Sequence, residues 1–478
     1  RLDKMHKIEE HGWLPFGHKF EWSHHAADIA EQFEELSANE TIVRLAGRVM
    51  AIRGHGKTCF MDLMDKSGRI QLYVRKDAIG EENYALIKMM DIGDIVGVCG
   101  TVFRTHMGEL SIKAASLEML SKSLRPLPEV IAAIKKAIAN VTRFHEEQVP
   151  KTWLTNREYG SMLGQKVTPL DSVGIYVPGG TAAYPSSVIM NACPAKVAGV
   201  PKIVMAVPPG KDGKVNPYVL VTAKEIGITD IYKMGGAQAV AAMAFGTETV
   251  PKVEKITGPG NIFVTLAKKA VYGHCDIDML AGPSEILIVA DESASPRYLA
   301  ADLLSQAEHD PLASAILVTD SEQVARDTMR ELELQLEALP RKGIAAVSLE
   351  GQGKVILADS METVVAMANM SAPEHLEIMT KAPFELLPFI RNAGAIFLGA
   401  YSPEPLGDYY AGPNHILPTG GTAKFYSVLN VETFMKKTSI IAYTDKALTA
   451  VADDIIVMAE AEGLQAHANV IRKRVEKE

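Results

Sequence analysis

The chain has 478 residues, of which 47% are hydrophobic, 22% charged and 6% aromatic. This is the composition of an ordinary globular protein, and it excludes disordered, collagenous and mucin-like chains. The 49 Lys and Arg against 58 Asp and Glu give a net charge of -9. Bulk positive charge therefore cannot carry a nucleic-acid role, and any such role needs a local site.

Neither a membrane span nor a secretory signal is indicated. No stretch approaches the roughly 18 uninterrupted apolar residues that a span needs, and no basic segment followed by an apolar one opens the chain. The four cysteines lie far apart without a CxxC pair, which favours free thiols over a zinc ribbon or a disulfide framework. We expect a cytoplasmic protein. Because the first residue is Arg1, we also expect that the sequence does not begin at a natural start.

Residues 41–118 read as short strands with apolar/polar alternation, separated by turns rich in Gly, Asp and Ser. A helix is expected at 81–90, before the fourth strand. The first four expected strands are 41–52, 58–64, 69–75 and 95–103. About five strands with one inserted helix is typical of a small Greek-key barrel of the OB type.

From about residue 129 the pattern changes to continuous apolar runs that alternate with helical segments such as 238–244 and 296–307. Continuous runs are typical of strands buried on both faces, so we expect two parallel sheets with crossover helices. The runs are 203–207, 286–289, 315–318, 355–357 and 395–398. Two prolines make residues 123–129 the expected linker.

Glycine-rich turns follow several of these runs, at 178–180, 235–236 and 258–261. The GxGxxG fingerprint of dinucleotide-binding sheets is absent. In a parallel sheet such turns gather at one edge, where glycine lets the backbone approach a ligand closely. Taken singly, each is more often only a turn.

Two pairs of polar residues after residue 129 are candidates for metal binding or proton transfer. Gln306 and His309 are expected on one face of a helix, where side chains at this spacing can hold one metal ion. Glu374 and His375 are adjacent after a proline and could share proton transfer if both face one cavity. For either pair alone, polar decoration of the surface is the commoner explanation.

Two further carboxylate and imidazole pairs follow. A Gly-rich loop is expected to present Asp408 and His415, and Glu462 and His467 lie near the end of the chain. Weak singly, these pairs together with the glycine turns indicate a redox site with a divalent metal held by oxygen and nitrogen ligands.

Residues 129–478 closely resemble histidinol dehydrogenase, through nine motifs in the same order. These are YVPGG at 176–180, GGAQ at 235–238, GPGN at 258–261, AGPSE at 281–285, SQAEH at 305–309, SAPEH at 371–375, GD at 407–408, GPNHILPTGG at 412–421 and EGLQAH at 462–467.

This resemblance implies the zinc- and NAD-dependent oxidation of L-histidinol, through the aldehyde, to L-histidine in histidine biosynthesis. It implies one zinc ion per subunit and a homodimer in which the partner subunit contributes the last metal ligand. The implied metal ligands are Gln306, His309, Asp408 and His467, and the implied NAD contacts are Tyr176, Gln238 and Asn261. The implied substrate contacts are Ser284, Gln306, His309, His375, Asp408, Glu462 and His467.

The dyad receives two roles on this basis. His375 would remove the hydroxyl proton while hydride leaves the alcohol carbon, because imidazole titrates near neutral pH. Glu374 would activate the water that attacks the aldehyde before the second hydride transfer.

Residues 1–128 resemble the anticodon-binding OB domain of class II lysyl-tRNA synthetases. The matching stretches are LPFGHKF at 14–20, AGRVMAIRGHGK at 46–57, SGRIQLY at 67–73, DIGDIVG at 91–97, GELS at 108–111 and LSKSLRPLP at 120–128. The resemblance implies that Phe60 stacks on an anticodon base and that Gln71 and Glu109 read base edges. The aminoacylation motifs are missing, so no ligase activity is expected.

The expected architecture is thus an N-terminal OB-fold β-barrel followed by an α/β histidinol dehydrogenase fold with two Rossmann-like parallel-sheet domains and a helical C-terminal tail. The expected domains are 1–128, with an N-terminal helical arm, and 129–478, which lacks the family's own N-terminal segment. Within the latter we expect an NAD-binding lobe at about 172–284, a second lobe at about 129–171 and 285–425, and the tail at about 426–478.

An alternative of another class stays open. The OB module could bind tRNA or other nucleic acid while attached to an incomplete, inactive dehydrogenase, or it could be only a structural module. The residues also leave open whether the fusion is natural or a chimera.

Overall fold

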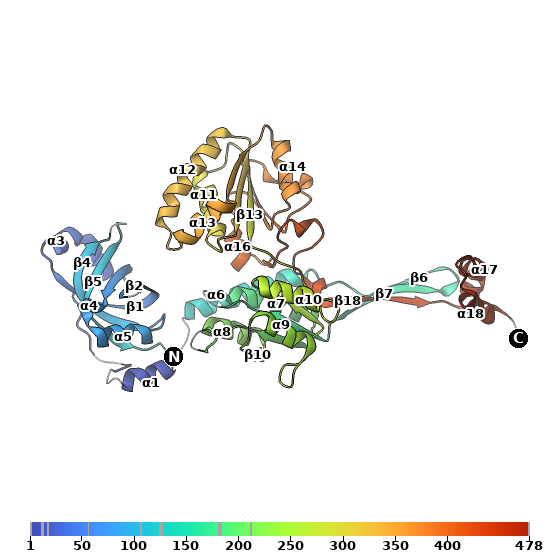
Figure 1. Ribbon diagram of the computed structural model, residues 1–478, viewed down its shortest axis with the longest axis horizontal. Helices are drawn as coiled ribbons and strands as arrows, with labels where there is room; N and C mark the ends of the chain where they lie inside the picture. Colours follow the sequence, from blue (N-terminus) through green and yellow to red (C-terminus); the bar gives the residue numbers. More distant parts are fainter. Residues whose placement is uncertain are drawn as a thin grey trace. The chain divides into compact units, whose positions relative to one another are not determined.

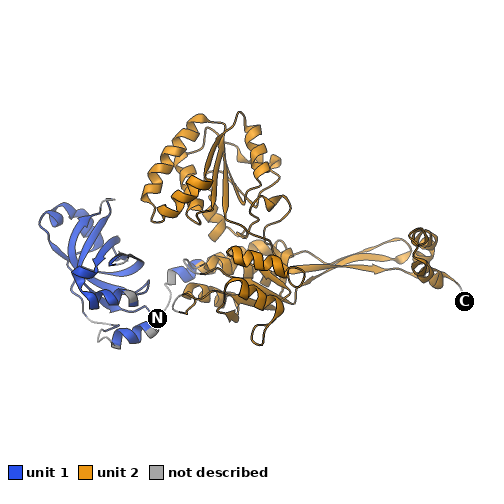
Figure 2. Cartoon of the chain, in the orientation of Figure 1, with its two compact units in different colours: residues 1–133 blue, residues 134–478 orange. Residues whose placement is uncertain are grey.

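The computed structural model describes residues 2–10, 14–16, 19–55, 57–105, 108–123, 128–179, 184–210 and 213–476. The chain divides into two compact units, residues 1–133 (unit 1) and 134–478 (unit 2), which Figure 2 distinguishes by colour. Most of the expected linker at 123–129 lies outside the described residues. Gly180, the last residue of the first glycine turn, also lies outside them.

Unit 1 contains the expected barrel with short helices before it. Its strands are β1 (Ile42–His55), β2 (Thr58–Met64), β3 (Arg69–Arg75), β4 (Ile95–Arg104) and β5 (Leu110–Ser121). Its helices are α1 (Leu2–Glu10), α2 (Ala26–Glu31), α3 (Phe33–Ala38), α4 (Lys76–Ile79) and α5 (Glu81–Met89). The predicted bounds of β2 and β3 are confirmed, and α5 precedes the fourth strand as predicted.

The five strands form a closed barrel in the order β1-β2-β3-β5-β4, which β1 closes by pairing with β4. Every second side chain of a strand points into the barrel. In β2, Cys59, Met61 and Leu63 are buried, whereas Phe60, between Cys59 and Met61, is half-exposed. A bulge interrupts the pairing of β4 with β5 at Gly100, where a Cβ atom would lie 2.1 Å from the Lys113 carbonyl oxygen. Only glycine fits this crossing of the strands.

A buried ion pair closes one end of the barrel. The side chains of Asp94 and Lys122 are fully buried, and Lys122 Nζ donates to Asp94 Oδ2 at 2.7 Å. The main-chain N–H groups of Asp91 and Ser123 donate to the same carboxylate. The pair therefore ties the loop before β4 to the end of β5.

Asp94→Ala is expected to destabilise the barrel by about 1–3 kcal/mol, because the two main-chain N–H groups that Asp94 accepts lose their partner and the buried Lys122 ammonium keeps only Asp91 as its counter-charge. Hydrogen exchange of the barrel amides in the full chain measures this free energy. Glu81→Ala is the control, because it removes the exposed ion pair of Glu81 with Lys76 and should leave exchange unchanged. Equal exchange rates in the two variants would contradict the assignment.

Unit 2 contains two parallel sheets, a third antiparallel sheet and the helices that cover them. Its strands are β6 (Trp153–Asn156), β7 (Met162–Pro169), β8 (Ser172–Tyr176), β9 (Lys202–Ala206), β10 (Asp230–Tyr232), β11 (Lys255–Thr257), β12 (Asp276–Ile277), β13 (Glu285–Ala290), β14 (Ser314–Thr319), β15 (Lys354–Leu357), β16 (His375–Met379), β17 (Ala395–Leu398) and β18 (Met435–Ala442). Its helices are α6 (Pro128–Glu146), which starts before the border of the units, α7 (Pro185–Ala198), α8 (Pro217–Ile226), α9 (Gly236–Phe245), α10 (Ile262–Val271), α11 (Pro296–Ala307), α12 (Glu322–Ala338), α13 (Lys342–Gln352), α14 (Met361–Ser371), α15 (Pro383–Leu386), α16 (Glu404–Tyr409), α17 (Asp445–Ala461) and α18 (Gln465–Val475). Short 3-10 turns are η1 (Glu158–Gly160), η2 (Leu387–Phe389), η3 (Thr422–Lys424) and η4 (Val431–Phe434).

The two predicted parallel sheets are confirmed, with the strand orders β10-β9-β8-β11-β12 and β15-β14-β13-β16-β17. Alternate residues of β13 enter opposite sides of the second sheet. Ile286 and Ile288 pack with α11 and α12, and Leu287 and Val289 pack with α14. Figure 1 shows α11, α12 and α13 on one side of β13 and α14 on the other. Burial of both faces explains the continuous apolar runs in the sequence.

A third sheet, which the sequence patterns did not predict, extends from this body. Strand β7 pairs antiparallel with β6 and with β18 in the order β18-β7-β6, and α17 and α18 follow β18. At its far end Thr444, the N-cap of α17, donates from Oγ1 to the Tyr159 carbonyl at 2.8 Å. We call β6, β7, β18, α17 and α18 the arm (Figure 1). All four residues of β6 are exposed, so no buried face marked the strand.

The remaining sequence expectations concern the thiols and the membrane. The four cysteines are free, and Cys59, Cys193 and Cys275 are buried, as expected. Among the described residues, no helix is long and apolar enough to cross a membrane.

Candidate active site

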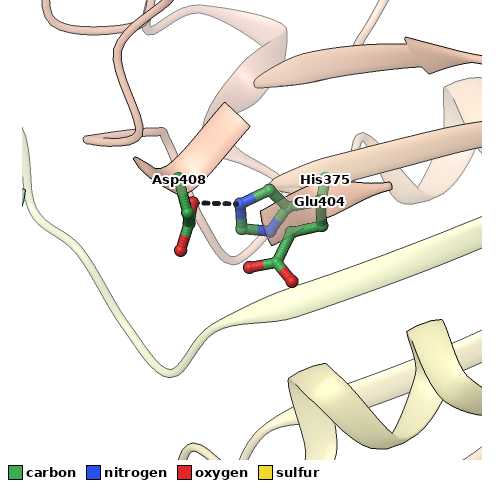
Figure 3. A group of neighbouring side chains, drawn as sticks. All are labelled: His375, Glu404 and Asp408. Atoms are coloured by element: carbon green, nitrogen blue, oxygen red, sulfur yellow. Dashed lines mark ion pairs between the residues drawn. The ribbon is translucent and has the colours of Figure 1, made fainter. Parts of the chain in front are cut away.

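Three potential metal ligands meet beside the second parallel sheet of unit 2. His375 begins β16, while Glu404 and Asp408 lie four positions apart in α16 and so on one side of that helix. Their ligand atoms all lie within 4.8 Å of one another. Figure 3 shows the three side chains and joins His375 Nε2 to Asp408 Oδ1, which lie 4.0 Å apart and form an ion pair only when the histidine is protonated. We expected Asp408 in a loop and missed Glu404, whose i, i+4 spacing to Asp408 acquires meaning only once both residues lie on one helix.

Gln306 lies on α11, and the residue before it, Ser305, donates from Oγ to Glu404 Oε2 at 3.0 Å. Gln306 is fully buried, and among the described residues neither its amide nitrogen nor its amide oxygen has a hydrogen-bond partner. A buried amide without partners is costly, and in a native protein it indicates a ligand that belongs there.

His309 follows the end of α11 and is exposed. Its main-chain N–H donates to the Gln306 carbonyl at 3.2 Å in a turn beyond the helix, so the two residues do not share one helix face as we expected. After burial, the larger cause, the charge of His309 is among those that lower the pKa of His375. His309 therefore lies near the same group of side chains.

The backbone of Glu285 holds the Glu374–His375 dyad. His375 Nδ1 lies 2.9 Å from the Glu285 carbonyl oxygen, and because a carbonyl only accepts, Nδ1 carries the proton. The Glu285 N–H in turn donates to Glu374 Oε2 at 2.8 Å. His375 Nε2 is then the basic nitrogen, and it has no partner among the described residues. The dyad predicted from adjacency is thus brought together at one buried point.

Burial sets the electrostatics of this site. It lowers the pKa of His375 to about 4, so the imidazole is neutral at pH 7. Burial raises the pKa of Glu374 well above its usual range. Burial also raises the pKa of Asp408 to about 6, and burial together with the Asp408 charge raises that of Glu404 to about 7. The carboxyl groups crowd together with little compensating positive charge, which a divalent cation would supply.

His415 supports this group from the loop after α16. Its Nδ1 donates to the Asp408 main-chain carbonyl at 3.1 Å. Burial lowers its pKa to about 4. His415 therefore fixes the end of α16 as a neutral hydrogen-bond donor.

The last predicted metal ligand, His467, lies elsewhere in unit 2. It is an exposed residue of α18, in the arm, and Glu462 is exposed at the end of α17. Figure 1 shows α18 at the outer end of the arm and α16 beside the second parallel sheet. Within one chain the structure brings His375, Asp408 and Glu404 together, but it does not bring His467 to them.

The glycine turns lie at the carboxyl ends of strands in the first parallel sheet, as predicted. Tyr176 ends β8, and its hydroxyl oxygen accepts the Gly236 N–H at 3.0 Å. Gln238 is exposed in the first turn of α9. Asn261 caps α10, where its Oδ1 accepts the N–H groups of Phe263 and Val264. The three predicted NAD positions therefore lie on connected turns at one edge.

Ser284 directly precedes β13, and its carbonyl accepts the Ser314 N–H at 3.0 Å. It thus adjoins Glu285, the residue that holds the dyad. A cavity of about 370 Å³ opens here, and its lining includes Glu285, Ser371 and Lys424.

In unit 1, the predicted Phe60 belongs to a row of three rings on the outside of the barrel. Its centroid lies 5.1 Å from that of Tyr73, which lies 5.7 Å from that of Phe103. Gln71 accepts a hydrogen bond from Ser111 Oγ at 2.9 Å. Tyr73 and Phe103 were missed, although Tyr73 lies two residues after Gln71 and so on the same face of β3.

Two further features of unit 1 complete this surface. Glu109 is exposed at the turn before β5, where its N–H donates to Thr105 Oγ1. Arg53 and Arg69 both pair with the buried carboxylate of Asp62. Aromatic rings beside arginines are the combination on which single-stranded nucleic acid stacks.

Two family models match the chain: histidinol dehydrogenase over residues 100–475, and the OB-fold nucleic acid binding domain over residues 43–120. The chain belongs to the histidinol dehydrogenase family. The two matches overlap at residues 100–120, a range that includes the end of strand β4 and nearly all of strand β5 of the OB barrel.

Individual histidinol dehydrogenases are similar over most of their length. That of Heliobacterium mobile is 57% identical over 371 residues, which are 78% of this chain and 87% of that protein. That of Bacillus subtilis is 58% identical over 345 residues, which are 72% of this chain and 81% of that protein. The crystal structure of histidinol dehydrogenase from Elizabethkingia anophelis matches with a TM-score of 0.71 and 42% identity, covering 73% of this chain and 81% of that one.

Proposed function

We propose that the chain oxidises L-histidinol, through L-histidinaldehyde, to L-histidine in cytoplasmic histidine biosynthesis, with zinc and NAD. The observation that carries this proposal is the unpartnered His375 Nε2, which lies 4.0 Å from Asp408 Oδ1 in a buried group of potential metal ligands. A neutral base that faces a metal-ligand group is the arrangement that metal-assisted alcohol oxidation needs.

The residues present fit a zinc ion. A cation would satisfy both the Gln306 amide, which has no hydrogen-bond partner among the described residues, and the crowded carboxyl groups of Glu404 and Asp408. We assign Gln306, His309 and Asp408 as ligands, joined by His467 of the partner subunit. When bound, the ion would hold the imidazole and amino nitrogens of the substrate and orient its alcohol carbon.

The remaining assignments divide between substrate and cofactor. Tyr176, Gln238 and Asn261 would contact NAD, which supplies the hydride acceptor for both oxidations. Their place at the carboxyl edge of a parallel sheet supports this assignment, since ligands of such sheets bind there. The substrate contacts would be Ser284, Gln306, His309, His375, Asp408, Glu462 and His467.

In the first oxidation His375 Nε2 takes the proton of the alcohol hydroxyl. The carbon that bears this hydroxyl would give its hydride to the nicotinamide. The Nδ1–H bond to Glu285 holds the ring in the tautomer that can accept this proton. In the second, the ionised form of Glu374, whose pKa burial raises, takes a proton from the water that adds to the aldehyde carbon. The hydrated aldehyde would then give its hydride to a second NAD and one hydroxyl proton to a base or to solvent, which leaves the carboxylic acid.

The full chain with L-histidinol and NAD is expected to produce NADH, to lose this activity with a chelator and to regain it with Zn²⁺. Asp408→Asn should lower both turnover and the zinc bound per chain, because it removes a ligand charge. Asp310→Asn, at an exposed carboxylate four residues beyond Gln306, is the matched control. A folded protein without turnover would favour the alternative of an OB module attached to an inactive dehydrogenase.

Glu374→Gln should slow oxidation of L-histidinaldehyde by roughly 10²–10⁴-fold, the usual contribution of a general base. Oxidation of L-histidinol to the aldehyde should suffer less, because glutamine keeps an oxygen that accepts the Glu285 N–H. Single-turnover NADH formation from each substrate separates the two steps. Equal losses in both would refute the division of roles between Glu374 and His375.

We further propose a homodimer with shared active sites. The arm supports it: Leu154, Ile441 and Met458 are large apolar side chains exposed there, and His467 lies on its outer helix. Exposed apolar surface of this kind marks protein contacts. A symmetric dimer that exchanges arms would bring each His467 to the other subunit.

Asp408→Ala and His467→Ala should each be inactive alone yet complement one another. After dissociation and reassociation of an equal mixture, about half of the dimers are mixed and each has one intact site, so roughly a quarter of the activity should return. NADH production by the reassociated mixture measures this recovery. If none returns although mixed dimers form, each active site lies within a single subunit.

A second function is favoured by the ring row of Phe60, Tyr73 and Phe103. We propose that unit 1 binds single-stranded RNA of the tRNA anticodon type, with Phe60 stacking on a base and Gln71 and Glu109 reading base edges. The neighbouring Arg53 and Arg69 would meet phosphate.

Phe60→Ala should weaken binding of a lysine anticodon stem-loop by about 5–150-fold, since stacking on one aromatic ring contributes roughly 1–3 kcal/mol. Fluorescence anisotropy of the labelled stem-loop measures the dissociation constant. Trp22→Ala removes an exposed ring outside the row and serves as the control. Unchanged binding in both variants would overturn the stacking role of Phe60, and no binding by the unmodified chain would leave the barrel a structural module.

We also propose the domain borders. An OB domain would span 1–128 and the dehydrogenase region, without its family's N-terminal segment, 129–478. Sheet β8–β12 supports an NAD-binding lobe at about 172–284, and sheet β13–β17 supports the second lobe, which includes 285–425 and about 129–171. Residues from about 426 onward form the tail, whose first part is strand β18.

A further inference from the structure

A buried ion pair holds one of the glycine turns of the first parallel sheet. Lys268, on α10, has a side chain only 3% exposed, and that of Asp278, which follows β12, is fully buried; the two form a salt bridge. Burying two charges is costly unless their remaining hydrogen-bonding groups are satisfied. Here both partners bond to the same residue, Gly258, the first residue of the turn.

The ion pair forms hydrogen bonds with both the N–H and the carbonyl group of Gly258. Its N–H donates to Asp278 Oδ2 at 2.8 Å, and its carbonyl accepts from Lys268 Nζ at 3.0 Å. Both polar groups of one residue are therefore assigned to one ion pair. Asp278 Oδ1 also accepts the N–H of Met279, which orients the carboxylate within its own loop.

The position of Gly258 determines that of its neighbours. Its φ is +111°, and a Cβ atom there would lie 2.2 Å from the Tyr176 carbonyl oxygen, so the turn packs directly on the backbone of Tyr176. Three residues later Asn261 caps α10. A displaced Gly258 would move both Tyr176 and Asn261, two of the three residues assigned to NAD.

We propose that Lys268 and Asp278 are positioning residues for NAD binding, which act by fixing the Gly258 turn between Tyr176 and Asn261. This inference rests on the proposed function. Neither side chain needs to touch the cofactor. The pair keeps the turn in its binding conformation before NAD arrives, so that binding does not have to order it.

A second buried lysine provides a matched control. Lys255 begins β11, the strand that leads into the turn, and is 9% exposed. It pairs with Asp276 at 2.8 Å and donates to the Thr433 carbonyl, away from Gly258. Lys255→Met therefore removes a largely buried cation from the same sheet without removing a contact of Gly258, although its partner Asp276 is half-exposed.

Lys268→Met in the full chain should raise the dissociation constant of NAD by about 10-fold or more, the typical cost of losing preorganisation at one loop. Isothermal titration calorimetry measures it directly. The KM for L-histidinol and the bound zinc should change less than about twofold, since the metal-ligand group lies in the other sheet. Lys255→Met should leave NAD affinity near that of the unmodified chain.

Asp278→Asn addresses the case in which Lys268→Met does not fold. Asparagine keeps one oxygen that can accept the Gly258 N–H, but it loses the charge and the second acceptor, Oδ1, which receives Lys268 Nζ and the Met279 N–H. It should weaken NAD binding in the same selective way. Unchanged NAD affinity in a folded variant, or equal weakening by Lys255→Met, overturns the positioning role. If the unmodified chain does not bind NAD, the proposed function fails and this inference fails with it.

Discussion

The peptide groups of Glu285 are the point on which the candidate chemistry of unit 2 depends. The carbonyl fixes the tautomer of His375 and the N–H orients the Glu374 carboxyl group. Glu285 begins β13, the central strand of the second sheet, whose next five residues are buried. Hydrophobic packing on both faces of that sheet therefore sets the geometry of the two titratable groups. The same burial produces their opposite pKa shifts, because it disfavours the charged form of each.

Much of the fold could be predicted because burial leaves a periodic trace in the sequence. The barrel strands alternate, and the bounds of β2 and β3 follow from that alternation. The parallel strands are buried on both faces, so they read as continuous apolar runs. The dyad was visible because Glu374 and His375 are adjacent, and the glycine turns because strand ends of a parallel sheet share an edge.

What the sequence could not predict lacks such a trace. Strand β6 is exposed on both faces, so it shows no alternation, and the arm was missed with it. Glu404 looks like an ordinary surface acid until the packing of α16 buries it next to His375. The separation of His467 from Asp408 is a matter of tertiary structure, and no local pattern contains it. Gly258 bonds to Lys268 and Asp278, which lie 10 and 20 positions further along the chain. Only the assembled sheet brings these three residues together.

The closed barrel of unit 1 bears on how such a chain can be made. Each of its five strands has a neighbour on both sides, so the barrel needs no strand from the rest of the chain to complete it. The dehydrogenase sheets are open and each has two edge strands. During synthesis the N-terminal domain emerges first, and a barrel that closes on itself can reach its final hydrogen bonding while the dehydrogenase is still being translated. A self-contained N-terminal barrel is thus suited to gene fusion, since translation can deliver it folded, with no unpaired strand edge to interfere with the chain that follows.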